Sequence, residues 1–285
     1  MIKEFVEAKT LLEAIELLRK PEARILAGGT TFFEFYERGL LSDVETIVNI
    51  EAIGLDYVTE TSEHVRIGAN ATLEALKQNS LLDAPQYFTL KEAVQKVHPV
   101  QVRNVATIGG SLCSSLPQYD PPISLWALDA NVVIVGPNQE RTVRVDEFCK
   151  GLLSPDLNPG EMVKEILIPK HDAGVGSSYF KLGRTHFDYG LVTAATLLQN
   201  GQDGALKKVR IVLGNYDEEK PFRALEVENA LTNRKMSPEI ISEAVRMLDN
   251  TSPHSLHASP AYRKEVAKTL VTQSLLESHR RANRP

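Results

Sequence analysis

The sequence predicts an α+β fold built from more than one structural unit. Its candidate strands and helices are short, and they do not alternate regularly enough for a doubly wound parallel sheet. The chain has 285 residues, of which 42% are apolar, so it exceeds the usual size of one domain and contains enough apolar residues for a sizeable core. A polar stretch at 170–177, which follows Pro169 and contains two glycines, marks the expected boundary between units.

The first unit shows a local signal for each expected element. A strand at 2–6 precedes a capping-box pattern, Thr10 to Glu13, that starts a helix ending before Pro21. A strand at 24–27 leads into a second helix that begins around Phe32. Further strands are expected at 46–50, 64–68, 102–108 and 166–168, helices at 72–78 and 89–97, and a hairpin of strands 131–136 and 141–145 around the turn 137–140.

The second unit reads as three strands followed by helices. The strands are expected at 178–182, 191–198 and 206–213. The last helix begins at Ser259, an N-cap residue followed by proline at the first helical position. Tyr262, Val266, Leu270 and Leu275 are expected along its buried face.

Composition excludes several classes of protein. A net charge of −5 and a sequence pI near 5.9 argue against nucleic acid as a partner. No apolar run approaches the length of about 18 residues that a membrane span needs, and residues 1–5 begin no secretory signal, so we expect a cytoplasmic protein without a membrane span. Two cysteines, Cys113 and Cys149, exclude a disulfide framework and a four-thiolate iron–sulfur cluster within this chain.

Catalytic motifs for other chemistries are also missing from the sequence. Its seven histidines show no H-E-x-x-H or C-x-x-C spacing, and even His254 and His257, which are three residues apart, lie in a polar Ser/Pro segment. We therefore expect no metal site. No G-x-S-x-G elbow supports a serine hydrolase, and no catalytic acid, base or nucleophile is assigned to this chain.

Two glycine-rich turns carry the main functional signal. One is AGGTT at 27–31 and the other is ATIGGS at 106–111, and each follows an apolar run that reads as a strand. Gly-Gly pairs permit positive φ and let consecutive N–H groups converge on an anion, while threonine hydroxyls add donors. Neither turn matches G-x-x-x-x-G-K-[ST] or G-x-G-x-x-G. Each alone is compatible with a structural turn, but the pair with Asp120 predicts one diphosphate held between the two turns.

At this point the chain resembles a known family. The AGGTT turn with Phe32 and Phe33, the segment HPVQVRNVATIGGSLCSSLPQYDPP at 98–122, LNPGE at 157–161 and FKLGRTHFDYGLV at 180–192 are similar to the flavoprotein subunits of molybdenum hydroxylases. This family includes the flavin-binding subunits of xanthine dehydrogenase, carbon monoxide dehydrogenase and nicotinate dehydrogenase. The similarity extends over nearly the whole chain, to SPAYRKEVAKTLV at 259–271.

The resemblance implies a fold and a division of the chain. Residues 1–173 would form an FAD-binding region of the vanillyl-alcohol-oxidase/p-cresol-methylhydroxylase type, with subdomains at about 1–53 and 54–173. Residues 174–285 would form a C-terminal domain with a three-stranded antiparallel sheet and a helical bundle.

It also implies a set of cofactor-binding residues, which combines two diphosphate-binding turns with contacts to the rest of FAD. The set is Ile25, Leu26, Ala27, Gly28, Gly29, Thr30, Thr31, Thr107, Gly109, Gly110, Ser111, Asp120, Leu157 and Lys181. Asp120 would accept a hydrogen bond from a cofactor hydroxyl, Leu157 would pack on the flavin, and the charge of Lys181 would stabilise the anionic reduced flavin. The alternatives are structural turns, a turn-forming aspartate, core packing of Leu157 and a solvated surface lysine.

Several positions depart from the family or keep two interpretations. Ser111 stands where many relatives have asparagine, Thr31 where acidic residues or serine are common, and Tyr119 where a small residue is common. These departures leave the diphosphate cradle intact and affect the surroundings of the flavin ring. Asp188 matches a family position that fits a turn, an ion pair or a cofactor contact, and Cys113 reads as a small buried thiol.

The resemblance finally implies an electron relay. A large molybdopterin-binding subunit would hydroxylate the substrate, a small subunit with [2Fe–2S] clusters would pass electrons on, and FAD in this chain would deliver them to NAD⁺ or another acceptor. Two alternatives remain open. One is a stand-alone flavin reductase of the same fold, and the other is a scaffold subunit that has lost FAD, which the departures at Thr31, Ser111 and Tyr119 suggest.

Overall fold

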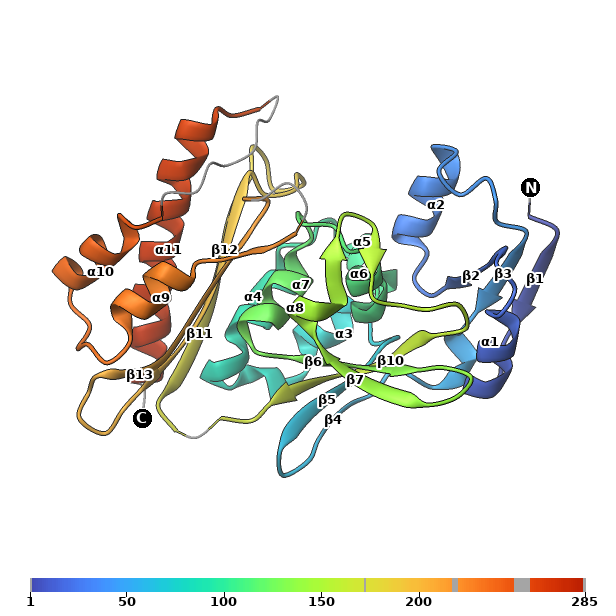
Figure 1. Ribbon diagram of the computed structural model, residues 1–285, viewed down its shortest axis with the longest axis horizontal. Coiled ribbons are helices and arrows are strands. Elements are labelled where there is room, and N and C mark those ends of the chain that lie inside the picture. Colours follow the sequence, from blue (N-terminus) through green and yellow to red (C-terminus); the bar gives the residue numbers. More distant parts are fainter. Residues whose placement is uncertain (1, 172, 217–219, 249–256, 284–285) are drawn as a thin grey trace.

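The computed structural model describes residues 2–283 except 172, 217–219 and 249–256, so His254 lies outside the described residues. It confirms the α+β prediction. Figure 1 shows a small N-terminal sheet at one end of the molecule, a five-stranded sheet in the middle, and a C-terminal sheet backed by helices at the other end.

The N-terminal unit is a parallel sheet in the order β1-β3-β2, formed by β1 (Glu4–Glu7), β2 (Ala23–Leu26) and β3 (Thr46–Asn49). Helix α1 (Leu11–Leu17) joins β1 to β2, and α2 (Thr30–Glu37) joins β2 to β3. The predicted N-cap is confirmed, because the Thr10 hydroxyl accepts from the backbone N–H of Glu13 at 3.2 Å. A small core around Ala14, Ile15 and Val48 holds this unit together.

The middle unit is an antiparallel sheet in the order β4-β5-β10-β6-β7. Its strands are β4 (Val58–Glu60), β5 (His64–Gly68), β6 (Asn131–Val135), β7 (Glu140–Arg144) and β10 (Met162–Pro169), and the predicted hairpin is β6–β7. Helices α3 (Leu73–Gln78), α4 (Phe88–Gln95) and α7 (Asp120–Ala127) build the largest core with it. In Figure 1, α4 and α7 lie between this sheet and the C-terminal one.

The predicted strand at 102–108 is wrong, because this segment forms α5 (Val100–Val105) and the start of α6 (Ile108–Cys113). A short apolar run fits a buried helix as well as a strand, so its pattern alone cannot decide between them. Contacts elsewhere in the fold decide it. Arg103 is 6% exposed, and its Nε donates to Glu74 at 2.6 Å while its Nη1 donates to the Val97 carbonyl at 2.8 Å. Thr107 then caps α6.

The segment after β7 completes this unit with short elements. They are α8 (Val145–Phe148), β8 (Cys149–Gly151) and β9 (Ser154–Pro155). The Ser115 hydroxyl, which follows α6, donates to the Gly151 carbonyl at 2.7 Å. This hydrogen bond ties the β8–β9 turn to the end of α6.

The C-terminal unit contains the three predicted antiparallel strands, β11 (Val175–Leu182), β12 (Val192–Asn200) and β13 (Leu206–Gly214). A two-residue strand, β14 (Phe222–Arg223), extends the sheet to the order β11-β12-β13-β14. Helices α9 (Leu225–Leu231), α10 (Pro238–Val245) and α11 (Pro260–Ala282) pack on one side of it (Figure 1).

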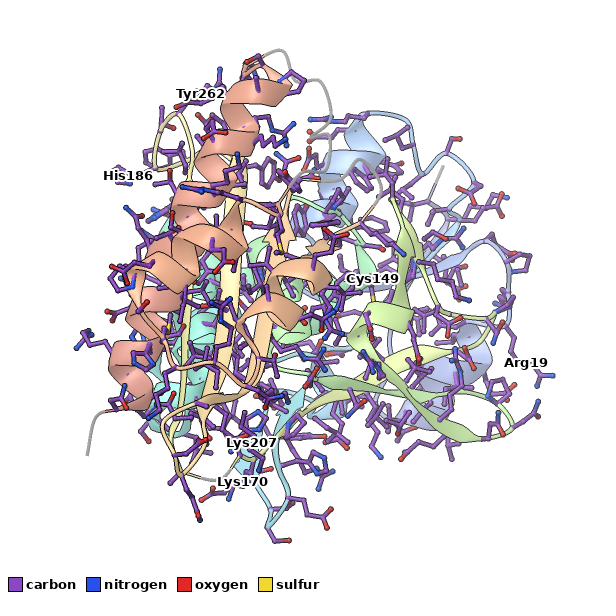
Figure 2. The ribbon with its side chains drawn as sticks, turned by 60° about the vertical axis from the view of Figure 1, so that its left-hand side comes forward. Arg19, Cys149, Lys170, His186, Lys207 and Tyr262 are labelled. Atoms are coloured by element: carbon purple, nitrogen blue, oxygen red, sulfur yellow. The ribbon has the colours of Figure 1, made fainter. Side chains whose placement is uncertain are left out.

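The buried face of α11 differs from the expectation. Tyr262, labelled near the N-terminal end of α11 in Figure 2, is 53% exposed, whereas Leu270 and Leu275 are buried as predicted. The buried face also contains Ser274 and Ser278, whose hydroxyls face polar groups of the sheet. Because Tyr262 is exposed, the apolar spacing predicted the wrong buried face at the first turn of α11. Among the described residues, no helix is both long and apolar enough to cross a membrane.

Candidate functional site

The first glycine turn opens onto an uncapped helix. Ile25 and Leu26 end β2, Ala27 and Gly28 lead into the turn, and Gly29 is the N-cap of α2 with φ +73°. No side chain caps this helix, and helix geometry leaves the N–H groups of Thr30, Thr31 and Phe32 without an intrahelical acceptor. These donors and the partial positive charge of an eight-residue helix form an arrangement suited to an anion.

The second glycine turn uses its amides within the chain. The N–H groups of Ile108 and Gly109 donate to the carbonyls of Ala71 and Ala69 at 3.0 and 2.9 Å. The Gly110 N–H donates to Thr107 Oγ1 at 3.1 Å. The sequence-based picture of converging amides therefore does not describe this turn as folded. Its remaining hydrogen-bonding capacity lies in hydroxyl groups, chiefly the Thr107 hydroxyl, which can still donate its proton.

Ser111 occupies the same turn and is also engaged. Its N–H and its hydroxyl both donate to the Thr107 carbonyl, at 3.0 and 2.9 Å. Serine therefore folds back onto the first turn of α6, where a longer amide side chain would extend further. Its oxygen keeps lone pairs that can accept a hydrogen bond.

The two glycine turns are in direct backbone contact. A Cβ atom on Gly28 would lie 1.8 Å from the Val105 carbonyl oxygen and 2.9 Å from the Ala106 Cα. Only glycine permits this approach. The first turn is therefore packed against the residues that immediately precede Thr107. The two turns that the sequence predicts to bind one diphosphate thus lie next to each other in the fold.

A hydroxyl network joins the same two segments and explains two of the departures from the family. Thr31 Oγ1 lies 3.0 Å from the Tyr119 hydroxyl and accepts from the Ser114 hydroxyl at 3.2 Å. Ser114 also contacts the Gly110 carbonyl at 2.8 Å. The ring of Tyr119 stacks on that of Tyr189 with centroids 5.6 Å apart. Thr31 and Tyr119 are thus partners of each other, and together they link α2 to the segment before α7.

Asp120 and Lys181 form a buried ion pair. Asp120 is the first residue of α7 and is 3% exposed, and its Oδ2 accepts from Lys181 Nζ at 2.8 Å. Lys181 Nζ also reaches the Lys96 carbonyl at 3.3 Å. Only 8% of the Lys181 side chain is exposed, so the alternative of a solvated surface lysine is wrong. The structure brings these two predicted residues together, and the aspartate balances the lysine charge.

Tyr179 completes this cluster, and sequence reasoning missed it. Its hydroxyl donates to Asp120 Oδ1 at 2.5 Å. Burial, followed by the Asp120 charge, raises the pKa of Tyr179 well above its ordinary value, so the phenol stays protonated and remains a donor. Burial raises the pKa of Asp120, while Lys181 and Tyr179 act in the opposite direction. The signal in the sequence was the spacing, because residues two apart in a strand share a face.

The other candidates have structural surroundings of their own. Leu157 is half-buried and packs against the central core. Asp188 accepts from the Thr185 N–H at 3.2 Å and lies 3.4 Å from Arg184, as expected for a turn and an ion pair. Burial raises the pKa of Cys113 and of Cys149 to about 12, which keeps both thiols protonated.

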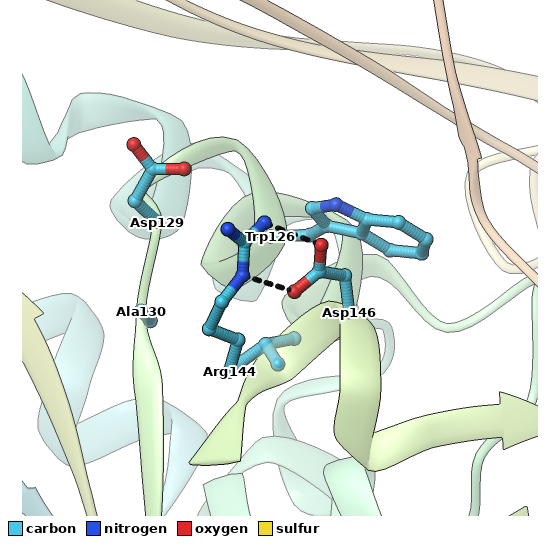
Figure 3. A pocket seen from close by; sticks show the side chains of 6 residues that line it. Trp126, Asp129, Ala130, Arg144 and Asp146 are labelled. Carbon is cyan, nitrogen blue, oxygen red and sulfur yellow. Dashed lines mark hydrogen bonds and ion pairs between the residues drawn. The ribbon is translucent and has the colours of Figure 1, made fainter.

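A small pocket beside α7 does not compete for the cofactor. Trp126, Asp129, Arg144 and Asp146 line it (Figure 3), and Arg144 binds Asp146 through two hydrogen bonds of 2.8 and 2.5 Å. Its volume is about 10 Å³, at most enough for a single water molecule. Asp129 also pairs with Arg210 of β13 at 2.7 Å, so this region serves to join the middle and C-terminal units.

Comparisons with known proteins identify the family of this chain. The family described as FAD binding domain in molybdopterin dehydrogenase matches residues 2–171, and the CO dehydrogenase flavoprotein C-terminal domain matches 177–278. The glyceraldehyde dehydrogenase medium chain of Sulfolobus acidocaldarius is 30% identical over 96% of this chain and 97% of its own. The carbon monoxide dehydrogenase medium chain of Afipia carboxidovorans is 29% identical over 96% of both.

Solved structures show the same similarity. Carbon monoxide dehydrogenase from Hydrogenophaga pseudoflava matches with a TM-score of 0.92 and 28% identity, over 99% of this chain and 98% of the other. Both family matches, the full-length relatives and the fold lead to one assignment. The chain belongs to the FAD-binding flavoprotein subunits of the molybdenum hydroxylases.

Proposed function

We propose that this chain holds FAD at the junction of its two glycine turns and serves as the electron-transfer subunit of a molybdenum hydroxylase complex. The observation that carries the proposal is the backbone contact of Gly28 with Val105 and Ala106, next to the uncapped start of α2. When bound, FAD supplies reversible two-electron redox chemistry. The residues of this chain supply binding, orientation and electrostatics.

In this proposal the diphosphate is bound mainly by the first turn. The N–H groups at the start of α2 donate to phosphate oxygens. Gly29 permits the positive φ at the N-cap, where a Cβ atom would lie 2.9 Å from the Phe33 ring. The Thr107 hydroxyl adds a donor from the second turn. Gly109 and Gly110 contribute by close packing, since a Cβ on Gly109 would lie 2.8 Å from the Ala69 Cβ atom.

The buried cluster would contact the rest of the cofactor. Each Asp120 oxygen already accepts one hydrogen bond, and a carboxylate has further lone pairs that can accept from a cofactor hydroxyl. Lys181 would lie near the flavin ring, with its charge shared between Asp120 and the reduced cofactor. Leu157 would pack against the flavin from the segment after β9.

The family and the cysteine count support the partners that we propose. Relatives are named as medium chains or as subunits of complexes, and this chain has only two cysteines, both free thiols, which are too few for a four-thiolate cluster. We assign the molybdopterin to a large subunit and the [2Fe–2S] clusters to a small one, with electrons entering singly and leaving to NAD⁺ or another acceptor. Free thiols suit the reducing cytoplasm, where we place the complex.

The division of the chain remains part of the proposal. Residues 1–173 would bind FAD and residues 174–285 would form the C-terminal domain. Strand β10 belongs to the middle sheet and β11 to the C-terminal sheet, and this change of sheet together with the two family matches supports the boundary.

The test is purification of the complex followed by cofactor and metal analysis. We expect a yellow protein with flavin absorption at about 450 nm, and equal amounts of a molybdenum subunit and an iron–sulfur subunit. An active homomer without either metal would instead support the stand-alone reductase. A colourless chain that FAD does not reconstitute would support the scaffold.

A pair of variants tests the site itself. Lys181→Met should weaken FAD binding, measured by titration of the apoprotein, because it removes the cation of the buried pair. The matched control is Lys170→Met, which removes the lysine that pairs with Glu60 at 2.7 Å and should leave FAD binding unchanged. Equal affinities in both variants would contradict the placement of Lys181 at the cofactor.

A further inference from the structure

Strand β11 is an edge strand, and two backbone groups on its open side are hydrogen-bonded by the side chains of an ion pair between two other elements. It has β12 on one side only, and an open edge leaves N–H and C=O groups without partners. On β11 the Tyr179 N–H donates to Glu92 Oε2 at 2.9 Å. The Ser177 carbonyl accepts from Arg281 Nη1 at 2.7 Å. These side chains replace the missing neighbouring strand.

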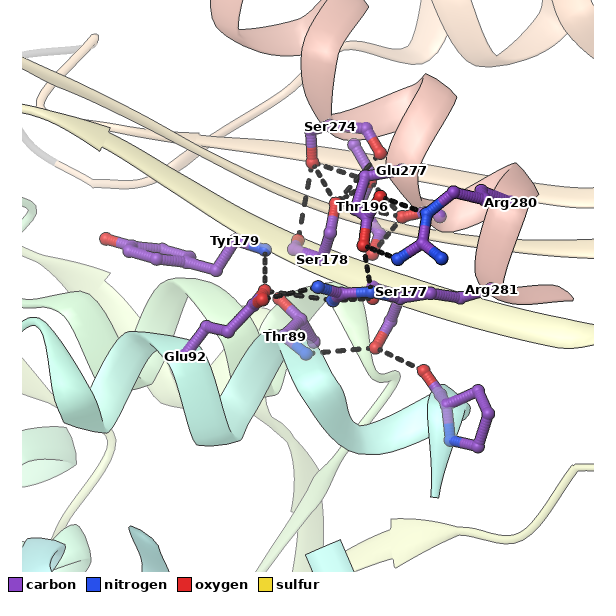
Figure 4. A network of polar contacts seen from close by, with 12 residues as sticks. Thr89, Glu92, Ser177, Ser178, Tyr179, Thr196, Ser274, Glu277, Arg280 and Arg281 are labelled. Atoms are coloured by element: carbon purple, nitrogen blue, oxygen red, sulfur yellow. Dashed lines mark hydrogen bonds and ion pairs between the residues drawn. The ribbon is translucent and has the colours of Figure 1, made fainter. Parts of the chain in front are cut away.

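The ion pair itself connects the middle and C-terminal units. Glu92 belongs to α4 and Arg281 to the last turns of α11, and Figure 4 shows both converging on β11. Arg281 Nη1 and Nη2 donate to the two oxygens of Glu92 at 3.0 and 2.5 Å. The guanidinium also lies over the Phe88 ring, 4.7 Å from its centroid. A bidentate, stacked arginine is held in one geometry.

The position of β11 decides which side chains reach Asp120. Ser177, Tyr179 and Lys181 share one face of the strand. The Ser177 hydroxyl accepts from the Thr89 N–H at 3.0 Å on α4, while Tyr179 and Lys181 both bind Asp120. A shift of one residue would turn all three away. The Glu92–Arg281 pair therefore fixes the strand at the residue that binds the aspartate.

We infer that Tyr179 is a positioning residue of the flavin site, and that Glu92 and Arg281 hold its backbone in place. This inference rests on the proposed function. The phenol donates to Asp120 and so offsets part of the carboxylate charge beside Lys181. Without that hydroxyl the carboxylate charge is less well compensated, so the electrostatic potential at the flavin site becomes more negative. The binding of reduced flavin, which carries additional negative charge, is then weakened more than the binding of oxidised flavin.

The first test is Tyr179→Phe, with Tyr87→Phe as the matched control. Tyr87 is a buried tyrosine whose hydroxyl has no hydrogen-bond partner within the described part of the chain. The dissociation constant of oxidised FAD and the flavin midpoint potential are measured for both variants and the wild-type complex. We expect Tyr179→Phe to lower the potential, equivalent to weakening reduced relative to oxidised FAD by about tenfold, the lower end for a hydrogen bond to a charged group.

The outcomes separate this inference from the proposed function. A wild-type chain that binds no FAD overturns both. A wild-type chain that binds FAD, with the same midpoint potential in Tyr179→Phe, overturns the inference alone. A shift of the same size in Tyr87→Phe also overturns it, because the effect would then follow from any buried tyrosine.

A second pair of variants decides the question if Tyr179→Phe does not fold. Glu92→Gln keeps an oxygen that can accept from the Tyr179 N–H, whereas Glu92→Leu removes both that acceptor and the charge that Arg281 binds. We expect Glu92→Leu to lower the midpoint potential, whereas the potential of Glu92→Gln should stay close to the wild-type value. If Glu92→Leu reduces stability and leaves the potential unchanged, the ion pair is only structural and the inference fails.

Discussion

The contact between the two glycine turns predicts that Gly28→Ala damages both folding and cofactor binding. The added Cβ would lie 1.8 Å from the Val105 carbonyl oxygen and 2.6 Å from the Val105 carbonyl carbon. Both atoms belong to the backbone, so no flexible side chain can move aside. Either the turn before α2 or the end of α5 must shift.

The expected loss of stability follows from overpacking. Extra atoms forced into a packed region cost about 1–3 kcal/mol, and a backbone neighbour places this site toward the upper end. Alanine also restricts the unfolded chain, which offsets about 0.4–1 kcal/mol. We therefore expect a net loss of about 2 kcal/mol. A shift of the turn should also weaken FAD binding by at least about tenfold, which corresponds to about 1.4 kcal/mol.

The assay is urea unfolding of the chain with and without FAD, together with an FAD titration. Gly151→Ala is the matched control, because a Cβ at Gly151 would meet nothing within 4 Å and its φ is not positive. The control should unfold and bind as the wild type does. Gly28→Ala should unfold at a lower urea concentration, and the stabilisation that FAD provides should shrink, since that stabilisation depends on affinity.

Two results would refute the reasoning at different points. If Gly28→Ala unfolds at the wild-type urea concentration, the two turns are not in the close contact described above. If it loses stability and keeps the wild-type FAD affinity, the contact exists but does not shape the cofactor site.

Three further predictions concern the interior of the protein. Arg103→Lys cannot keep both hydrogen bonds of the buried guanidinium, so it should cost about 1–3 kcal/mol in urea unfolding; an unchanged midpoint would contradict the role of the Glu74 pair. Ser274→Ala removes a hydroxyl that lies 2.7 Å from both Ser178 Oγ and Thr196 Oγ1 (Figure 4), and it should cost a similar amount in urea unfolding. The pKa of Glu277 is lowered from its ordinary 4.5 to about 2, and the largest cause is its hydrogen bonding with Arg280. A carboxylate with a lowered pKa stabilises the fold above its unfolded pKa, so stability should fall from pH 4.5 towards 2, and Glu277→Gln should reduce this dependence in thermal unfolding.

Elements that depend on neighbouring residues were predicted well. The caps at Thr10 and Ser259 formed as expected, with the Ser259 hydroxyl accepting from the Tyr262 N–H at 3.2 Å. The hairpin at 131–144 and the three long C-terminal strands also agree with the structure. Capping, turns and alternating burial act over a few residues, so the sequence pattern contains their cause.

Elements that depend on distant partners were not predicted. The segment 102–108 became helical in a setting where Arg103 binds Glu74, which is 29 residues away along the chain. The buried face of α11 contains Ser274, whose partners Ser178 and Thr196 lie 96 and 78 residues away. A buried polar residue looks like an exposed one in the sequence until its partner is known.

The sequence by itself determined the chemistry available to this protein: two glycine turns, an aspartate and a lysine of the right types, too few cysteines for a cluster, and membership of a flavoprotein family. The tertiary structure alone decided how these groups meet. It placed Gly28 against Val105, and it joined Asp120 to Lys181 and Tyr179 across 61 and 59 residues of chain. The physical reason is that packing sets such contacts, and packing depends on the whole fold and not on any local pattern.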